Sequence, residues 1–446
     1  MKMIYKPSYL LRQGHFVADQ GVYVENGMIV EVARIEYLLE KYKEANVIDW
    51  TGQALVPGTV NAHNHSFQSL LRGLVIDRPF LEWRDKALYH YSPLLSAKDI
   101  YTGALFAFGE MMRYGVTTVC DFFYLHNQGI ESDAAIIQAA KDVGIRLVLA
   151  RTMYDWDGAP TGYRETVAEA VTNTRKLALQ YQTNPMVQVI PAPHSLHAAS
   201  LEMVQAGHHL ALELGTRFHI HVAEEPFEGE ETKRSYGLTP VEVLKKIGVL
   251  DESMVAIHAV WLTDTDIKLM GAGAVKLAYC PSSNMFLADG VTKIIDLMKA
   301  GVVVGLGTDG ACSNNRISVF EEMRMTALLQ KVSLLNATAL SAKQVFAMGT
   351  ANGQDLLGIP VGKIEPGYYA DFVGIDITDL SVQPIYEIDE QLLPNMVYSM
   401  QPSAITHVVV GGIEQIKNKQ RVNLSEENIY KQLQVLLGKL VSQGTV

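Results

Sequence analysis

The chain has 446 residues, of which 48% are apolar and 19% are charged, as in an ordinary globular enzyme with one large and one smaller domain. Its formal net charge of -11 disfavours nucleic acid and anionic membranes as partners, because their phosphates would be repelled. No apolar run has the length of a membrane span and the first residues lack the apolar core of a signal peptide, so we expect a cytoplasmic protein. The cysteines Cys120, Cys280 and Cys312 lie far apart, which argues against a disulfide framework and indicates small core residues.

The pattern of residues in the first part of the chain is typical of a small β domain. Residues 1–56 carry short stretches that alternate between apolar and polar side chains, and Asn26-Gly27 is a strong hairpin signal. An apolar run then leads into Asn61-Ala-His-Asn-His65. Side chains two apart on a strand point to the same side, so His63 and His65 would present two imidazoles to one point.

Residues 57–360 have the pattern of repeated βα units, in which short β-branched runs alternate with longer segments of helical period. The predicted strands are Ala54–His65, Val116–Tyr124, Arg146–Tyr154, Val187–His194, Arg217–Glu224, Met254–Trp261, Val275–Cys280 and Val302–Asp309. Among the helices between them, Ser96 can cap the segment 97–114, and Thr239 with Pro240 opens another that ends near Gly248. Eight such units form a TIM (β/α)8 barrel with its active site at the carboxyl ends of the strands. The alternative is an open doubly wound sheet, but no glycine-rich dinucleotide turn follows the first strand.

Residues 361–424 show the same pattern of short strands and turns as the N-terminal segment. We therefore predict that residues 1–56 and 361–424 fold together into one small β-sandwich domain beside the barrel. The last segment, residues 425–446, is amphipathic and is predicted to be a helix on the outside of that domain.

Polar residues end most of the predicted barrel strands. They are His63 and His65 on the first, His194 on the fourth, His219, His221 and Glu224 on the fifth, His258 on the sixth and Asp309 on the eighth. Burying so many titratable groups together is costly unless a metal or a reaction offsets the cost. Imidazoles with one carboxylate suit zinc, iron or a similar ion that keeps one position for water. Such a metal lowers the pKa of water to about 7, so hydroxide becomes available for hydrolysis.

Two of these residues suit the remaining tasks of a hydrolase. A carboxylate is needed to move protons, a role suited to Glu224, and a donor is needed to polarise the electrophilic carbon, a role suited to His258. Together with the metal, they provide the chemistry for hydrolysing a carbon–nitrogen bond.

The chain resembles the amidohydrolase superfamily, in its branch of mononuclear-metal deaminases, over essentially its whole length. The motifs that carry the resemblance are Val56-Pro-Gly-Thr-Val-Asn-Ala-His-Asn-His65, His219-Ile-His-Val-Ala-Glu224, Gly307-Thr-Asp-Gly-Ala-Cys-Ser-Asn-Asn315 and Gly362-Lys-Ile-Glu-Pro-Gly-Tyr-Tyr-Ala-Asp-Phe372. The resemblance implies an enzyme that releases ammonia from an amidine-like carbon of a small molecule by attack of metal hydroxide. A homodimer is the usual state of such enzymes.

The resemblance also assigns roles to residues. It implies that the metal ligands are His63, His65, His221 and Asp309. Asp309 would also take the proton of the attacking water, Glu224 would be the proton shuttle, and His258 a donor beside the metal. His219 lies one pleat deeper than His221 and is interpreted as barrel packing. No lysine ends the fourth strand, where binuclear members carry a carboxylated one, so one divalent metal is expected, zinc first and iron as the alternative.

The motifs do not agree on the substrate. The front half is most similar to formimino-glutamate deiminases, which implies a pocket lined by Gln68, Arg84, Tyr124, His194 and the position of His197. Those enzymes have an arginine in place of His197, however, and both Gly307–Asn315 and Cys280–Met285 are similar to purine-type deaminases. Two nearby arginines, Arg72 and Arg78, are interpreted as solvated.

Three functions follow as hypotheses. The first is a deaminase or iminohydrolase acting on a formimino compound or on an aminopurine, pterin or related ring. The second is a triazine hydrolase that displaces halide or alkylamine with the same hydroxide. The third is a non-catalytic assembly module, which need not keep the metal ligands that this chain retains.

Overall fold

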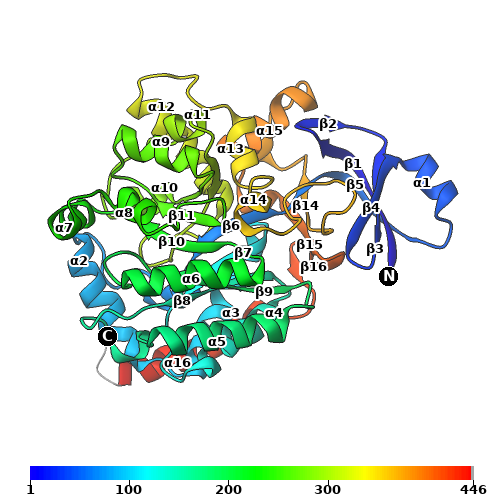
Figure 1. Cartoon of the computed structure of the whole chain (residues 1–446). Coiled ribbons are helices and arrows are strands. Elements are labelled where there is room, and N and C mark those ends of the chain that lie inside the picture. The colour runs from blue at the N-terminus through cyan, green and yellow to red at the C-terminus, as the bar shows by residue number, and fades with distance from the viewer. Residues whose placement is uncertain (443–446) are drawn as a thin grey trace.

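The computed structural model describes residues 1–442 and shows an α/β protein in two parts (Figure 1). A small β domain, built largely from the two chain ends, lies at the right of the view, and a larger part with two parallel sheets and their covering helices lies at the left. None of the described helices is long and apolar enough to cross a membrane.

The small domain contains one sheet whose strands come from both chain ends. Its strands are β1 (Lys2–Arg12), β2 (His15–Val17), β3 (Gln20–Glu25), β4 (Met28–Arg34), β5 (Asn46–Pro57), β14 (Phe372–Asp376), β15 (Ile405–Val410), β16 (Ile413–Lys417) and β17 (Gln420–Arg421). They follow the order β17-β16-β15-β14-β5-β1-β3-β4, with β2 paired to β1. The predicted hairpin is present between β3 and β4, where Asn26 and Gly27 both have positive φ.

The sequence predicted a sandwich, whereas hydrogen bonds join these nine strands into a single sheet. The reason is the long strand β5, which pairs in parallel with β1 on one side and antiparallel with β14 on the other. Val56 faces Val373 in that second ladder, so the C-terminal strands continue the N-terminal sheet. One face packs around Tyr5, Trp50 and Phe372, and helix α1 (Ile35–Lys41) covers Ile4 and Tyr23 on the other.

The larger part contains two four-stranded parallel sheets. The first comprises β6 (Thr59–Asn64), β7 (Val116–Phe123), β8 (Arg146–Met153) and β9 (Val187–Pro193), and the second β10 (Phe218–Val222), β11 (Met254–His258), β12 (Lys276–Tyr279) and β13 (Val303–Leu306). The predicted first strand, Ala54–His65, is divided at Gly58 between the small domain and β6. A Cβ at Gly58 would overlap the side chain of Thr117 on β7, so only glycine fits at this position.

The two parallel sheets meet along two seams. Among the described residues, one backbone hydrogen bond crosses each seam: His221 N donates to His194 O over 3.0 Å, and Asp309 N donates to His63 O over 3.0 Å. Both bonds lie at the carboxyl ends of the strands. The seams therefore bring four of the predicted site residues directly beside one another.

Helices follow the strands and cover the outer faces of both sheets (Figure 1). They are α2 (Phe80–Trp83), α3 (Ala97–Arg113), α4 (Ile130–Val143), α5 (Val167–Tyr181), α6 (Leu201–Leu214), α7 (Pro226–Tyr236), α8 (Pro240–Lys246), α9 (Asp264–Ala272), α10 (Pro281–Phe286), α11 (Ile294–Lys299), α12 (Val319–Ser333), α13 (Ala342–Met348), α14 (Gly353–Leu357) and α15 (Ile388–Tyr398). The two helix starts that the sequence predicts, those of α3 and α8, have capping boxes, formed by Ser96 with Asp99 and by Thr239 with Glu242.

The C-terminal helix α16 (Glu426–Ser442) packs against α3 of the larger part, not on the outside of the small domain as predicted (Figure 1). Gly109 on α3 leaves room for this contact, because a Cβ there would lie 2.9 Å from the Ile429 side chain. At the other end of the helix, Lys439 pairs with Asp99.

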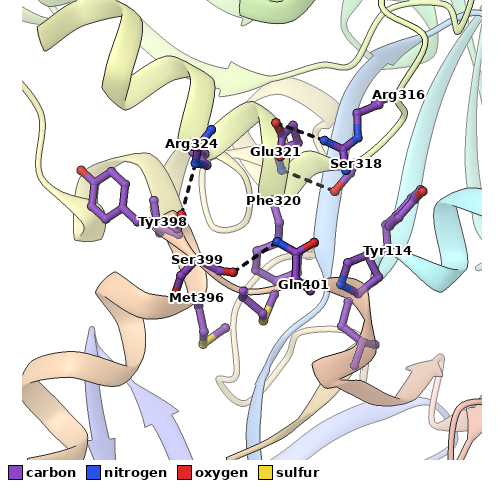
Figure 2. A pocket seen from close by; sticks show the side chains of 14 residues that line it. Tyr114, Arg316, Ser318, Phe320, Glu321, Arg324, Met396, Tyr398, Ser399 and Gln401 are labelled. Carbon is purple, nitrogen blue, oxygen red and sulfur yellow. Dashed lines mark hydrogen bonds and ion pairs between the residues drawn. The ribbon is translucent and has the colours of Figure 1, made fainter. Parts of the chain in front are cut away.

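A polar pocket opens where α12 meets the segment that follows α15 (Figure 2). Arg316 pairs with Glu321 at 3.4 Å, and Arg324 Nε donates to Tyr398 O over 3.2 Å. None of the predicted site residues lines this pocket.

Candidate active site

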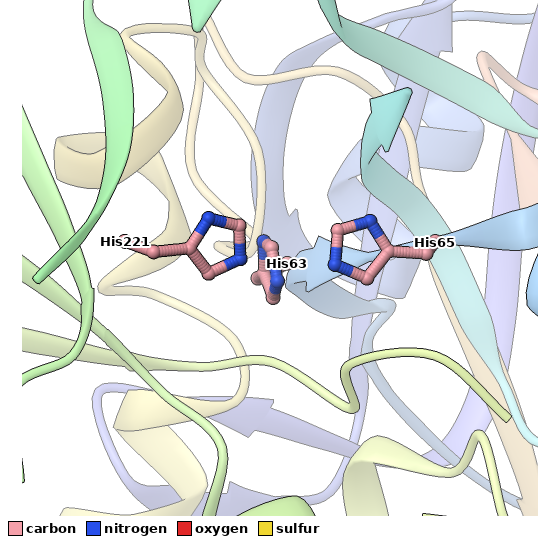
Figure 3. Close-up of side chains that lie close together, drawn as sticks. All are labelled: His63, His65 and His221. Atoms are coloured by element: carbon pink, nitrogen blue, oxygen red, sulfur yellow. The ribbon is translucent and has the colours of Figure 1, made fainter. Parts of the chain in front are cut away.

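Three imidazoles converge between the two parallel sheets. His63 and His65 come from the end of β6, and His221 comes from β10, so the three rings approach one point from different sides (Figure 3). Ring nitrogens of the three lie within 4.8 Å of one another. All three side chains are buried.

Asp309, which follows β13, completes this group. Its Oδ1 lies 3.2 Å from His65 Nε2 and 3.4 Å from His63 Nε2. Its Oδ2 accepts hydrogen bonds from Ser283 Oγ at 2.6 Å and Ser313 Oγ at 2.9 Å. The carboxylate is thus held from behind, with one oxygen aimed at the imidazoles.

The imidazoles are oriented by backbone carbonyls. His65 Nδ1 lies 2.6 Å from Phe122 O, and His221 Nδ1 lies 3.0 Å from His194 O. A carbonyl only accepts, so each Nδ1 carries a proton, and Nε2 is the remaining nitrogen of each ring that can bind an ion. A ring that is held in this way offers its Nε2 lone pair to a divalent metal when it binds.

His63 provides the test of whether a metal fits. The ring is fully buried, its Nδ1 has no hydrogen-bond partner within the described residues, and its Nε2 lies 3.4 Å from Asp309 Oδ1 without a well-formed hydrogen bond. Burial lowers the pKa of His63 to about 3, so the ring is neutral. A buried imidazole that is so poorly hydrogen-bonded is costly, and an ion held between His63, His65, His221 and Asp309 would remove that cost. The donor set of three nitrogens and one carboxylate oxygen suits zinc or a similar ion.

The protonation state of Asp309 agrees with this role. Burial by itself would raise the pKa of Asp309, but His63 and His65 more than offset it and hold the pKa well below its usual range. Asp309 is therefore ionised. Its φ of 56° is unusual for a residue other than glycine, and such backbone strain gathers at functional sites.

Glu224 and His258 form a second group beside the first. Glu224 Oε1 lies 3.3 Å from His258 Nε2, and ligand atoms of Glu224, His258 and Asp309 lie within 4.8 Å of one another. His258 Nδ1 lies 2.9 Å from Asn284 Oδ1, which can accept a hydrogen bond from the Nδ1–H group. Burial, then the charges of Asp289 and Asp309, raises the pKa of Glu224 well above its usual range, and burial lowers the pKa of His258. These directions favour a protonated Glu224 carboxyl beside a neutral His258 ring, so Glu224 is the group suited to donate a proton.

Two of the five predicted substrate residues, His194 and Tyr124, lie against the imidazoles, and a third, Gln68, contacts Tyr124. His194 stacks on His221 with ring centroids 4.8 Å apart, and the ring of Tyr124 lies 5.2 Å from that of His65. Gln68 Nε2 donates to Tyr124 Oη over 2.9 Å, and Cys312 Sγ donates to Gln68 Oε1 over 3.1 Å. Gln68 is thus held between Cys312 and Tyr124.

The other two predicted substrate residues lie farther out. Arg84 pairs with its neighbour Asp85 at 2.8 Å, and its guanidinium lies over the rings of Tyr89 and Trp156, 4.8 and 5.6 Å from their centroids. A hydroxyl pair between Tyr89 and Tyr154, 2.9 Å long, separates Arg84 from His194.

His197 has a different neighbour. Its Nδ1 lies 3.6 Å from the carboxylate of Glu228, and its ring contacts those of His194 and Phe227. The remaining histidine of the fifth strand, His219, points away from the site toward Cys120 Sγ and Leu356 O.

The sequence reasoning missed several residues that support the site. Ser283 and Asn284 lie in the Cys280–Met285 motif, which was recognised without a role for its side chains. Glu228 could have been found, because it lies four residues after Glu224 on the adjoining helix. No local pattern marks the tyrosines at positions 89, 154 and 163, which contact one another and of which Tyr154 contacts His194.

Comparison with known proteins identifies the family. The model of the amidohydrolase family matches residues 54–414. The chain belongs to the amidohydrolase family. It is a hydrolase that acts on carbon–nitrogen bonds.

Similar curated proteins include two deaminases. The 5-methylthioadenosine/S-adenosylhomocysteine deaminase of Pelotomaculum thermopropionicum is 32% identical over 426 residues, which cover 95% of each chain. The 5'-deoxyadenosine deaminase of Methanothermobacter thermautotrophicus is 36% identical over 370 residues, covering 82% of this chain and 84% of the relative.

Solved structures have the same fold. An adenosine deaminase from Xanthomonas campestris with bound zinc superimposes with a TM-score of 0.91 at 26% identity, covering 99% of this chain and 98% of the other. A zinc complex of atrazine chlorohydrolase from Arthrobacter aurescens has a TM-score of 0.88 at 23% identity, covering 98% of this chain and all of the other, which shows the shared fold alone.

Proposed function

We propose that this protein is a zinc-dependent deaminase that replaces the amino group of an adenine ring by a carbonyl in a small adenosine derivative. The observation that carries the proposal is the Glu224–His258 pair, which sits beside three imidazoles and a carboxylate arranged for one metal. The relatives named above, which are deaminases of adenosine derivatives, support the purine alternative. They do not support the formimino substrate that the front-half motifs suggested.

The chain's own residues supply the proton transfers. His63, His65, His221 and Asp309 would hold the ion, which when bound supplies the Lewis acidity that lowers the pKa of water at the site. Asp309 is ionised and would accept the proton of the attacking water. Glu224, whose raised pKa favours the protonated form, would donate to the ring nitrogen next to the carbon under attack. His258, held by Asn284, would orient the attacking oxygen.

The overall change balances without a further reactant. Water adds to the amino-bearing ring carbon while Asp309 takes one of its protons and Glu224 protonates the ring nitrogen. Asp309 passes its proton to the amino group, the carbon–nitrogen bond breaks and ammonia leaves. The second proton of the water returns to Glu224 as the carbonyl forms. The buried aromatic neighbours His194 and Tyr124 are proposed to contact the ring. Gln68, Arg84 and His197 are more distant supports in this proposal.

Other features also remain proposals. We propose that the two parallel sheets close into a TIM barrel spanning residues 57–360, supported by the backbone bonds across both seams. Residues 1–56 with 361–424 would then be the small domain. The predicted C-terminal helix, 425–446, corresponds to α16, and its last four positions, 443–446, lie outside the described residues. A cytoplasmic homodimer is proposed from the usual state of such enzymes, and sedimentation of purified protein measures the oligomeric state.

The test combines metal analysis with a substrate panel. We expect one zinc ion for each chain, and ammonia release from 5'-deoxyadenosine, methylthioadenosine or S-adenosylhomocysteine above that from formimino-glutamate, guanine and pterins. A chlorotriazine serves as the comparison for halide release. Little bound metal and no turnover of any compound after zinc addition would instead favour the assembly module.

A further inference from the structure

The backbone that carries Glu224 makes an unusual turn. Ala223, directly before it, has a φ of 51°, in the left-handed region that is unfavourable for a residue with a side chain. Ala223 O accepts hydrogen bonds from Val260 N at 3.0 Å and Trp261 N at 2.9 Å, in the turn after β11. The carbonyl side of this turn is therefore tied to the strand end that carries His258.

The amide side of the same turn is held by one carboxylate. Glu228 Oε1 accepts from Glu224 N at 2.9 Å and from Glu225 N at 3.1 Å, and its Oε2 lies 3.2 Å from Ala223 N, which donates to it. Three consecutive backbone amides thus converge on a side chain that is only 3% exposed. Hydrogen bonds to an ionised acceptor are about twice as strong as neutral ones.

Helix capping explains only part of this arrangement. A glutamate at the third position of a helix ordinarily reaches back to one amide, that of the capping residue, here Glu225. The two further amides belong to Ala223 and Glu224, which lie before the helix. Their bonds restrain the residue whose carboxyl faces His258.

His197 keeps this carboxylate charged. Burial by itself would raise the pKa of Glu228, but His197 and the backbone amides more than offset it and lower the pKa. The Nδ1 of His197 lies 3.6 Å from Glu228 Oε2, and within the described residues it has no hydrogen-bond partner. His197 is thus the ion-pair neighbour of the Glu228 carboxylate.

We propose that Glu228 is a positioning residue: its carboxylate fixes the Ala223–Glu225 backbone so that the Glu224 carboxyl is held 3.3 Å from His258 and toward the substrate. The proposal rests on the proposed function in one respect, the role of Glu224 as proton donor. Glu228 itself does not contact the reacting atoms.

The first test is the Glu228→Gln variant of the zinc-loaded enzyme, assayed with the best adenosine derivative. An amide cannot accept from all three amides, so the turn loosens, and kcat should fall about 10²-fold while KM and bound zinc change little. Glu231→Gln, on the exposed side of α7, is the matched control. In a Glu224→Gln background the same change should have almost no effect, because the group that Glu228 positions is already gone.

Three outcomes would overturn the proposal: an unchanged kcat, a loss that persists in full in the Glu224→Gln background, or zinc loss that accounts for the change. If Glu228→Gln does not fold, His197→Asn decides, since it removes the partner of Glu228 and keeps the three amide bonds. A smaller fall in kcat at constant KM supports the proposal, whereas an unchanged kcat or a raised KM opposes it.

Crystal structures separate this inference from the proposed function. If no compound in the panel is deaminated, the proposed function fails, but the zinc-bound wild type and Glu228→Gln can still be compared. A displaced Glu224 carboxyl, with its contact to His258 opened, supports positioning by Glu228. A Glu224 in the same place in both structures refutes it.

Discussion

At the scale of single residues, hydrogen bonds fix three of the four proposed metal ligands, whereas the fourth is held less firmly. Backbone carbonyls orient His65 and His221, and two serines hold Asp309. His63 is buried without such support: within the described residues its Nδ1 has no hydrogen-bond partner, and its Nε2 lies 3.4 Å from Asp309 Oδ1. That difference makes His63 the residue whose environment depends most on a bound ion.

We predict that His63→Ala and Glu224→Gln separate metal binding from proton transfer. His63→Ala should lose most of the bound metal and all turnover. Glu224→Gln should retain the metal and lose about 10²–10⁴-fold in kcat, because only the proton donor is removed. Elemental analysis and ammonia release measure both. Equal metal loss in Glu224→Gln would show that Glu224, His258 and Asp309 form the ligand group instead.

A second prediction at this scale concerns pH. Glu322 on α12 is fully buried and accepts from Ser282 N at 3.1 Å and Asn314 Nδ2 at 2.9 Å. Burial raises the pKa of Glu322 from 4.5 to about 8. Between these values the folded protein keeps a proton that the unfolded chain has released, so this group's contribution to stability is full below 4.5 and is lost as the pH rises toward 8.

Glu322→Gln should therefore flatten the pH dependence of stability. One such proton contributes a slope of at most about 1.4 kcal/mol for each pH unit. Urea unfolding at several values between about pH 5 and pH 8 measures it, with wild type as the reference. Parallel pH curves for the two proteins would contradict the prediction.

At the scale of elements, helix α16 shows how packing overrides a local pattern. Its amphipathic period is visible in the sequence, and Ile429, Leu436 and Leu440 are buried as that period requires. The surface that it covers is α3, where Gly109 allows the close approach.

We predict that Leu436→Ala lowers the free energy of unfolding by about 2–5 kcal/mol, because it removes a buried side chain from the contact between α16 and the larger part. The neighbouring Val435→Ala is the control, since Val435 is 75% exposed and its truncation should change stability by no more than about 0.5 kcal/mol. Denaturant titration measures both. A similar loss in the two variants would place the helix elsewhere.

At the scale of the whole molecule, a buried ion pair joins the two parts. Arg146 begins β8, and Asp371 directly precedes β14 of the small domain. Arg146 Nε and one Nη each donate to the Asp371 carboxylate over 2.9 Å, and the guanidinium lies over the ring of Tyr369. Asp371 also accepts from Gly411 N at 2.7 Å, so the pair links β8 of the larger part to the β15–β16 turn.

We predict that Asp371→Asn destabilises the protein by about 3–5 kcal/mol, because it leaves the Arg146 charge buried without its counter-ion. Glu213→Gln is the matched control. This variant breaks the bidentate ion pair between Glu213, whose side chain is 50% exposed, and Arg175, whose side chain is 38% exposed. The free energy of unfolding should fall by less than about 1 kcal/mol. Equal effects in urea unfolding would show that burial does not decide the value of these pairs.

Features with local causes could be predicted from the sequence alone. The Asn26-Gly27 hairpin, the caps at Ser96 and Thr239, and the eight strands of residues 57–360 follow from turn chemistry, side-chain hydrogen bonds and periodicity within a few residues. The amidohydrolase resemblance, carried by short motifs at strand ends, is confirmed by the family match.

Features with distant partners required the tertiary structure. His197 and Glu228 are 31 positions apart in the chain and meet only because β9 and β10 lie side by side across a seam. The break at Gly58 depends on Thr117, and the single sheet of the small domain depends on β5 pairing with β14. The sequence by itself thus determined the reaction class, since the chemistry of His, Glu and Asp at strand ends is local. Only the tertiary structure decided what surrounds them, because burial and hydrogen-bond partners come from segments remote in the chain.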